Sequence, residues 1–265
     1  MRAIRCDVSV PGQIAELAAL VRATGRLRSV VHTAGLSPSM AAGRRVLEVN
    51  LAGTVLPLDA FFPIAEAGTG VVAIAALAAH FGLGSAELNA ILDEPLRPGF
   101  LDRLTEAYRS EYGDDLGPEI AYSLSKQAMV RLIQRLTVAW GAKGARLCTI
   151  SPGLMDTPMG RQELAASATM GRRIAAVPVR RPRFRASLNL PGRAEDIAQA
   201  AAFLCSDSAS HISGIDLLLD DGLRAAMSWE QRDSREPGPA RCCPRGRPLM
   251  SAGTGCRRSF SQHAG

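Results

Sequence analysis

A tyrosine and a lysine stand four residues apart in the stretch "AYSLSK", residues 121–126. If the stretch is helical, Tyr122 and Lys126 project from the same face, because residues at i and i+4 are neighbours on a helix. A phenol ordinarily titrates near pH ~10, and a nearby cation favours its phenolate form. Such a pair can exchange a proton with an alcohol or a ketone as general acid and base. The same spacing also arises by chance in many helices, so the pair alone does not establish catalysis.

The six cysteines do not form a metal-binding pattern. Three lie inside apolar runs, where cysteine behaves as a small core residue, namely Cys6, Cys148 and Cys205. The others, Cys242, Cys243 and Cys256, lack partners at metal-ligand spacing. The sequence therefore predicts no metal site. With no long apolar run and no signal-peptide core near the N-terminus, we expect a reduced, cytoplasmic protein that does not associate with a membrane.

The chain carries a formal net charge of +6, and much of the excess sits near its end. There, arginines alternate with proline, glycine and serine, a composition that buries too little apolar surface to order itself. We expect residues 228–265 to form a disordered basic tail. A nucleic-acid-binding arm is the alternative, but the tail lacks the interleaved aromatic residues that stack on bases. The prediction is that the chain binds no nucleic acid.

Short apolar runs alternate with amphipathic stretches along residues 1–227, which is typical of βαβ units feeding a parallel sheet. The predicted fold is a doubly wound α/β domain of the Rossmann type. Strands are expected within 3–8, 27–35, 69–80, 145–153 and 214–222, and helices within 9–25, 46–68, 122–144 and 193–206. Residues 81–120 are predicted to be an insertion with one or two short polar helices, a candidate lid over the site. Residues 154–191 are expected to be a loop region.

Several fragments occur in an order and spacing that resemble the short-chain dehydrogenase/reductase family. They are "CDVS", "HTAG", "VNLAG", the Tyr-x-x-x-Lys pair, "SPGLMDTPM" and "DDG", spread over residues 1 to 225 or so. The insertion and the run "AWGAKGARLCTISPG" look most similar to the branch that includes bacterial 3α-hydroxysteroid dehydrogenase/carbonyl reductase. The resemblance implies an oxidoreductase that moves a hydride between NAD or NADP and a secondary alcohol or ketone, with steroid-like compounds among the candidate substrates.

By the same resemblance, Tyr122 is the proton donor or acceptor, and Lys126 is its electrostatic partner and a ligand of the nicotinamide ribose. Asn50 is expected to anchor a water relay through its helix. The alternative role of Asn50 is to satisfy backbone groups at an irregularity of that helix.

The resemblance also assigns cofactor contacts outside the pair. The adenine is expected to meet Asp7 and Val8, and the backbone at Ala34 and Gly35 is expected to approach the cofactor closely. The loop from Pro152 to Thr157 is expected to clamp the nicotinamide, with Met155 and Thr157 near the carboxamide. As alternatives, Asp7 caps the helix that follows it, and the Pro152 turn is needed for the chain reversal alone.

The family's catalytic serine has no counterpart here. The stretch "IAALAAH", residues 74–80, places Ala76 at that position, and alanine has no hydroxyl to hold a substrate oxygen. Loss of one preorganised donor lowers turnover by about 10²–10³-fold. Ser85 and Ser123 are the candidates for compensation. We therefore expect weak or no activity, with a non-catalytic binding or scaffold protein as the alternative function and a homo-oligomer as a possible state.

A glycine-rich strand–turn–helix that would receive the cofactor's pyrophosphate is expected before residues 3–8, and only two residues precede them. The sequence is thus interpreted as an N-terminally truncated domain without its first βαβ unit. A misplaced start codon and a decayed gene are both open explanations. The strand at "VVHTAG" is expected to have an unpaired edge, which favours aggregation.

Overall fold

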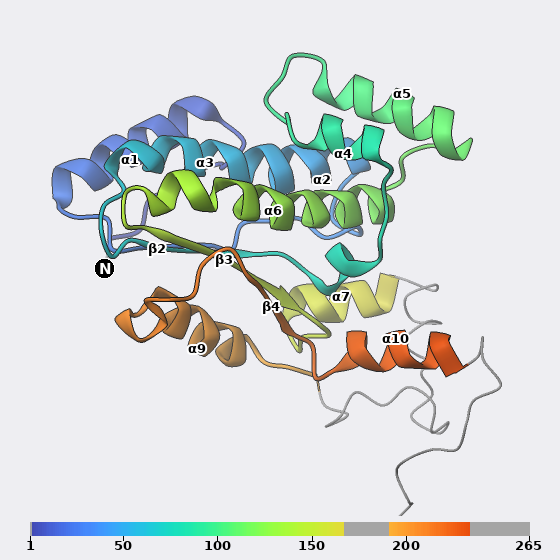
Figure 1. The fold of residues 1–265 in the computed structure, drawn as a ribbon. Coiled ribbons are helices and arrows are strands. Elements are labelled where there is room, and N and C mark those ends of the chain that lie inside the picture. Colours follow the sequence, from blue (N-terminus) through green and yellow to red (C-terminus); the bar gives the residue numbers. More distant parts are fainter. Residues whose placement is uncertain (1, 167–190, 234–265) are drawn as a thin grey trace, which may run out of the picture.

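Four parallel strands form the sheet at the centre of the protein (Figure 1). The computed structural model describes residues 2–166 and 191–233. The strands are β1 (Ser29–His32), β2 (Gly70–Ile74), β3 (Arg146–Pro152) and β4 (Asp216–Leu219), paired in the order β1-β2-β3-β4. In register, Val30 lies opposite Val71, and Val72 opposite Cys148. The predicted parallel α/β sheet is confirmed.

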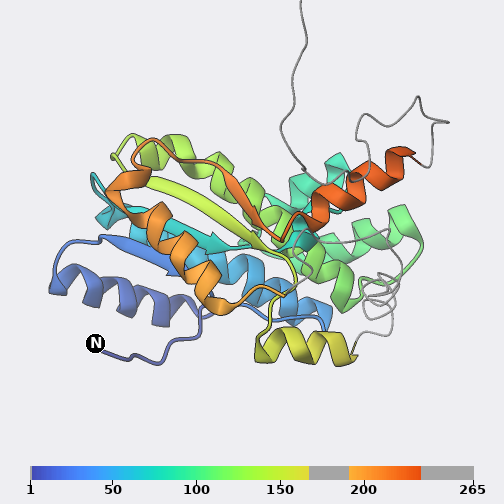
Figure 2. The same ribbon diagram turned by 90° about the horizontal axis from the view of Figure 1, so that it is seen from below.

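Helices cover both faces of the sheet. One face carries α1 (Pro11–Thr24), α2 (Gly43–Leu47), α3 (Gly53–Phe61) and α6 (Pro118–Gly141), as Figure 1 shows. The other face carries α9 (Ala194–Cys205), which lies across the strands in the view from below in Figure 2. This arrangement of helices on two sides is the doubly wound architecture that the alternation of apolar runs predicts.

Strand β2 shows why its sequence is apolar at every position. Alternate side chains of a strand point to opposite faces of a sheet. Val71 and Ala73 therefore join the core under α3 and α6, while Val72 packs with Ala201 and Leu204 of α9. Because both faces of a parallel sheet are buried, the continuous apolar run is required.

The insertion forms two helices, as predicted, namely α4 (Ala86–Leu92) and α5 (Phe100–Tyr112). Its buried residues Leu88, Leu92 and Leu104 form a second apolar cluster with Leu124 of α6. Ser85 caps α4 by accepting a hydrogen bond from the Leu88 amide at 3.2 Å. The insertion thus braces the helical layer around the amino-terminal half of α6.

The sequence-based expectations are wrong in four places. Residues 3–8 do not form a strand, because no neighbouring strand pairs with them in the part of the chain that the structure describes. Helix α1 begins at Pro11 after Val10, which makes no side-chain cap, so Asp7 does not cap it. Within the predicted loop 154–191, residues Pro158–Ala166 form helix α7. Helix α10 (Leu223–Asp233) continues past Met227, and the remainder of the predicted basic tail lies outside the described residues.

The expected unpaired edge of the sheet is present at β1. Among the described strands, β1 pairs with β2 alone, and the side chain of Val31 on it is 47% exposed.

The helical stretch Gly43–Ile64 is long and apolar enough to cross a membrane by length and composition alone, with a mean hydropathy of 1.2. Its apolar side chains instead contact the sheet and α6, with Leu47 and Leu51 fully buried. Between α2 and α3 the stretch widens into a π-helical turn, η1 (Glu48–Ala52), with Asn50 at its centre. Such turns are frequent at functional sites.

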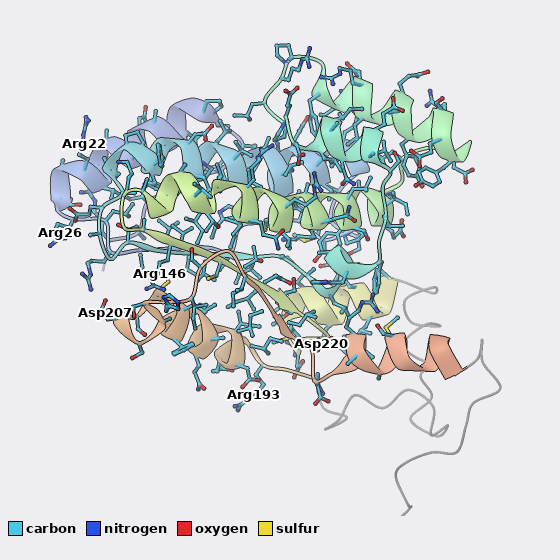
Figure 3. The ribbon with its side chains drawn as sticks, in the orientation of Figure 1. Arg22, Arg26, Arg146, Arg193, Asp207 and Asp220 are labelled. Atoms are coloured by element: carbon cyan, nitrogen blue, oxygen red, sulfur yellow. The ribbon has the colours of Figure 1, made fainter. Side chains whose placement is uncertain are left out.

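Buried Arg146 fastens α9 to the sheet. From the start of β3 its guanidinium donates to the carbonyl oxygens of Leu204 and Ala209, at 2.8 and 2.7 Å, and to that of Ser206 at 2.9 Å. Figure 3 shows Arg146 close to the turn that carries Asp207.

Asp220, at the junction of β4 and α10 in Figure 3, accepts hydrogen bonds from the amides of Gly222 and Arg224. The predicted motif "DDG" therefore begins a helix here.

Candidate active site

A cleft of about 510 Å³ opens at the carboxyl ends of the strands. Ligands of open parallel sheets bind at this edge, because the loops that leave neighbouring strands diverge there. The lining comes from the ends of β1, β2 and β3 and the segments that follow them, and from helices α6, α7, α9 and α10. The volume lies in the range of small-molecule sites. The cleft brings together these predicted residues: Gly35, Tyr122, Lys126, Pro152, Met155 and Thr157.

Tyr122 and Lys126 line the cleft together from α6. The Lys126 ammonium lies 5.8 Å from the centre of the Tyr122 ring and donates a hydrogen bond to the Ile74 carbonyl oxygen at 2.7 Å. Burial lowers the pKa of Lys126 to about 8, because desolvation disfavours the charged ammonium. At neutral pH the lysine still carries a proton, so the cation that the sequence predicts is present beside the phenol.

The pKa of Tyr122 moves in the direction opposite to the one expected. Burial, and then the carboxylate of Glu163, raise it to about 12, whereas the sequence predicts a lowering by Lys126. The reason is that the ring is desolvated and that Glu163 of α7 faces the same cleft. The phenol is therefore protonated at neutral pH and is set up to donate its proton.

Asn50 occupies the π-helical turn and holds the loop that follows β1. Its side-chain oxygen accepts from the Leu36 amide at 2.7 Å, and its side-chain nitrogen donates to the Leu36 carbonyl oxygen at 2.9 Å. The same nitrogen lies 3.3 Å from the Ser125 hydroxyl, which donates to the Tyr122 carbonyl oxygen. These contacts match the alternative role, in which Asn50 satisfies backbone groups. Its role in a water relay stays a prediction.

Thr54 makes a second polar contact with the π-helical turn that carries Asn50. The Thr54 hydroxyl donates to the Asn50 carbonyl oxygen at 2.7 Å and lies 3.0 Å from His32 Nε2. Burial, with the nearby charge of Lys126, lowers the pKa of His32 to about 4, so the imidazole is neutral. Since the Thr54 proton is already donated, His32 Nε2 carries the hydrogen in this contact.

Gly35 is packed closely enough that a side chain there would press on the Asn50 amide. A Cβ there would lie 3.2 Å from the Asn50 side-chain oxygen and 3.6 Å from Lys126 Nζ. The glycine of "HTAG" thus lets the loop after β1 pass directly over the lysine. The loop and the Tyr122–Lys126 pair are held in one rigid unit as a result.

Ala76 lines the cleft at the end of β2, at the position where the sequence predicts a missing hydroxyl. The two serines considered as candidates for compensation are committed elsewhere. Ser123 donates to the Glu119 carbonyl oxygen at 3.0 Å within α6, and Ser85 caps α4. Neither residue lines the cleft. The expected compensation by Ser85 or Ser123 therefore has no support in the geometry.

A shallower hollow of about 830 Å³ adjoins the cleft and holds the other predicted cofactor residues, Asp7, Val8 and Ala34. Gly35 and Leu36 line both spaces, so the two are continuous along the loop after β1. The Asp7 carboxylate accepts from the Ser9 amide and hydroxyl and from Arg45 at 3.0 Å. The Ser9 contacts, more than Arg45, lower the pKa of Asp7.

The loop after β3 is ordered by its own backbone contacts. Met155 and Gly192 pair in an isolated parallel β-bridge, in which the Asp156 amide donates to the Gly192 carbonyl oxygen at 2.7 Å. The Thr157 hydroxyl accepts from the Gly160 amide at 3.1 Å in the first turn of α7. A Cβ at Gly153 would lie 2.7 Å from Asp220, so this turn needs glycine for packing. Pro152, Met155 and Thr157 are thereby held at the cleft.

Helix α7 contributes more to the cleft than the insertion does, since the insertion adds Phe81 alone to the described lining residues. Met159, Gly160, Glu163 and Leu164 of α7 line it, while α4 and α5 contribute none of the described lining residues. Glu163 also accepts from the Ser39 amide at 2.9 Å and from the Ser39 hydroxyl, which ties α7 to the loop after β1. No sequence motif points to Glu163, Ser37 or Ser39. Within residues 2–166 and 191–233, no group of three His, Cys, Asp or Glu side chains is placed to hold a metal.

Comparison with known proteins points to one class of oxidoreductases. A family model described as enoyl-(acyl carrier protein) reductase matches residues 116–224. Short-chain dehydrogenase/reductase bsc3 of Alternaria brassicicola is 29% identical over 84% of this chain and 77% of its own. The 3-alpha-hydroxysteroid dehydrogenase/carbonyl reductase of Comamonas testosteroni is 27% identical over 78% of this chain and 77% of its own.

A solved structure agrees with these relatives. The 3-alpha-hydroxysteroid dehydrogenase of Pseudomonas sp. B-0831, crystallised as a complex with NADH, superposes with a TM-score of 0.70 at 28% identity. The match covers 86% of this chain and 85% of that one.

Proposed function

The chain belongs to the short-chain dehydrogenase/reductase family, and on this premise we propose that it transfers a hydride between a nicotinamide cofactor and a secondary alcohol or ketone. The observation that carries the proposal is the joint position of Tyr122 and Lys126 in a cleft at the carboxyl edge of the sheet. The tyrosine places a hydroxyl proton, and the lysine a positive charge, beside any carbonyl that enters.

The residues at the cleft fit the nicotinamide end of such a cofactor. Within the described residues, Lys126 Nζ uses one of its three protons, on the Ile74 carbonyl oxygen, and the other two remain for the hydroxyls of a ribose. The narrow approach over Gly35 admits a ligand against bare backbone. Met155 and Thr157 would lie against the nicotinamide. The hollow at Asp7, Val8 and Ala34 would take the adenosine half.

When bound, NAD(P)H supplies the hydride to the carbonyl carbon. The Tyr122 hydroxyl donates its proton to the carbonyl oxygen, so the ketone gains a hydride and a proton and becomes a secondary alcohol. Lys126 stabilises the phenolate that is left behind through its positive charge. Asn50 is a positioning residue that does not take part in the proton transfer itself. It holds Leu36 and, through Ser125, the backbone of Tyr122. In the reverse direction the phenolate takes the proton of the alcohol.

The lining of the cleft selects an apolar substrate. Most of its side chains are aliphatic, aromatic or sulfur-containing, among them Val31, Ile74, Leu77, Phe81, Leu154, Met159, Ile197 and Leu223. Desolvation of a hydrocarbon skeleton against these residues is favourable. The names of two similar proteins, both 3-alpha-hydroxysteroid dehydrogenases, support an alicyclic or steroid-like alcohol or ketone.

The proposal is tested with the full chain in two steps. Calorimetry with NADH and NADPH measures binding and the preference between them, and oxidation of the bound cofactor is then followed with cyclohexanone and acetophenone. Binding followed by ketone-dependent oxidation supports the proposal. A folded chain that gives no heat with either cofactor contradicts it and favours a scaffold function.

Replacement of Glu163 by Gln is expected to shift the pH profile of alcohol oxidation toward lower pH. The carboxylate is one of the two causes that raise the pKa of Tyr122, and the amide removes its charge but keeps an oxygen for the Ser39 amide. Oxidation needs the phenolate, so its rise with pH follows this pKa. Because burial is the larger cause, the pKa falls but stays above its ordinary value.

The measurement is kcat/KM for cyclohexanol oxidation against pH. Glu106→Gln serves as the control, since Glu106 lies on α5 with a 78% exposed side chain and does not line the cleft. A Glu163→Gln profile that coincides with the unmodified and Glu106→Gln profiles contradicts the assigned influence of Glu163 on Tyr122.

A further inference from the structure

Ser37 is a buried hydroxyl in the cleft without a hydrogen-bond partner. The residue is 2% exposed and lines the same cleft as Tyr122 and Ala76. Its Oγ has no partner in the described part of the chain. A buried hydroxyl that makes no hydrogen bond lowers the stability of the folded protein, so such groups call for an explanation.

The backbone of Leu36 and Ser37 makes several hydrogen bonds, whereas the Ser37 side chain makes none among the described residues. The preceding peptide is fixed because Asn50 bonds both the amide and the carbonyl of Leu36. The Ser37 amide lies 3.5 Å from the Met40 sulfur, and the Ser37 carbonyl oxygen accepts from the Met40 amide at 3.0 Å. The hydroxyl thus stands on a rigid loop, which is the condition for a preorganised donor.

We propose that the Ser37 hydroxyl donates a hydrogen bond to the oxygen of the bound alcohol or ketone, and so serves as the second oxygen-binding group beside Tyr122. The proposal rests on the proposed function and adds a residue to it. In an otherwise apolar stretch of the lining, the hydroxyl gives a substrate oxygen a partner that Ala76 cannot supply. Substrate binding then gives the Ser37 hydroxyl the hydrogen-bond partner that it lacks among the described residues of the free protein.

Other hydroxyls and orphan groups fit this role less well. Ser123 and Ser85 are hydrogen-bonded to α6 and α4 backbone atoms, and neither lines the cleft. The other buried polar atom without a partner among the described residues, Nη1 of Arg103, belongs to α5 and is likewise outside the lining. Ser37 alone of these combines burial, an unused hydroxyl and a position at the cleft.

The test compares Ser37→Ala with Ser123→Ala in the full chain. Both variants remove a buried serine hydroxyl from a segment next to the site, but Ser123 lies outside the cleft lining. For reduction of cyclohexanone by NADH, we expect Ser37→Ala to lower kcat by about 10²-fold and Ser123→Ala to leave it within a few-fold. Removal of an unpaired hydroxyl also predicts that free Ser37→Ala melts at the same temperature as the unmodified chain or higher.

Equal kcat for Ser37→Ala and the unmodified chain overturns the role of Ser37 and leaves the proposed function standing. If the unmodified chain shows no turnover, the proposed function fails. The readout is then the rise in melting temperature that cyclohexanol causes in the presence of NAD. A smaller rise in melting temperature for Ser37→Ala than for Ser123→Ala then supports the Ser37 contact. An equal rise, or none with any of the proteins, contradicts it.

Discussion

Tyr122→Phe is expected to lower the rate of ketone reduction by about 10²–10⁴-fold, because it removes the hydroxyl in the cleft that gives its proton to the substrate oxygen. The ring is kept, so the packing of α6 against the cleft is preserved. Binding of NADH should persist, since Lys126 and Gly35 are untouched. The loss should therefore fall on kcat, measured from the oxidation of NADH with saturating cyclohexanone.

Tyr108→Phe is the matched control for this variant. Tyr108 is a buried tyrosine on α5 in the cluster that braces α6, and it does not line the cleft. The Tyr108→Phe variant removes a phenolic oxygen from the helices that pack against α6 but leaves the residues of the cleft unchanged. Equal kcat values for Tyr122→Phe and Tyr108→Phe would remove Tyr122 from the mechanism.

Ala76→Ser is expected to raise kcat, by as much as about 10²-fold, because it adds a hydroxyl donor at the end of β2 within the cleft. The backbone at Ala76 is extended, with φ of −170° and ψ of 158°, a conformation that serine adopts freely. The substitution is small enough for a residue that borders open space. The measurement is kcat for cyclohexanone reduction in the presence of NADH.

Ala79→Ser controls for the addition of a hydroxyl nearby, since Ala79 lies in the short helix Leu77–His80 that follows Ala76 but outside the described cleft lining. If Ser37 already holds the substrate oxygen, the two donors overlap in function. Ser37→Ala should then cost less in the Ala76→Ser background than in the unmodified chain, which is the non-additivity of neighbouring groups that act on one atom. An unchanged or lower kcat in Ala76→Ser contradicts the prediction that a hydroxyl at this position assists the reaction.

The strands and the main helices of the fold could be predicted because their signal is local. Val71, Val72 and Cys148 stand in short apolar runs, and such runs between amphipathic stretches indicate buried parallel strands. The shared face of Tyr122 and Lys126 follows from helical geometry alone. Residues 3–8 have the same local signal as a strand, but a strand exists only with a hydrogen-bonded neighbour, and none pairs with them in the described structure.

The chemistry of the site depended on tertiary contacts that the sequence does not display. The expected fall in the pKa of Tyr122 considers Lys126 alone, whereas burial and Glu163, separated from it by forty-one positions, raise it. The lid was assigned to the polar insertion, but α7 contributes more to the cleft, through residues that read as a loop. Ser37 has no motif around it, and its importance lies in an unused hydroxyl that becomes visible when Leu36 and Met40 are in place.

The central claim is hydride transfer at the Tyr122–Lys126 cleft, and isotope transfer tests it most directly. The full chain is incubated with NADH deuterated at the reactive carbon of the nicotinamide and with cyclohexanone, and the alcohol is analysed by mass spectrometry. We predict cyclohexanol with one deuterium on the carbinol carbon, in an amount that falls to background with Tyr122→Phe. Cofactor that binds while the ketone stays unreduced, or deuterated alcohol that forms equally with Tyr122→Phe, would contradict the account.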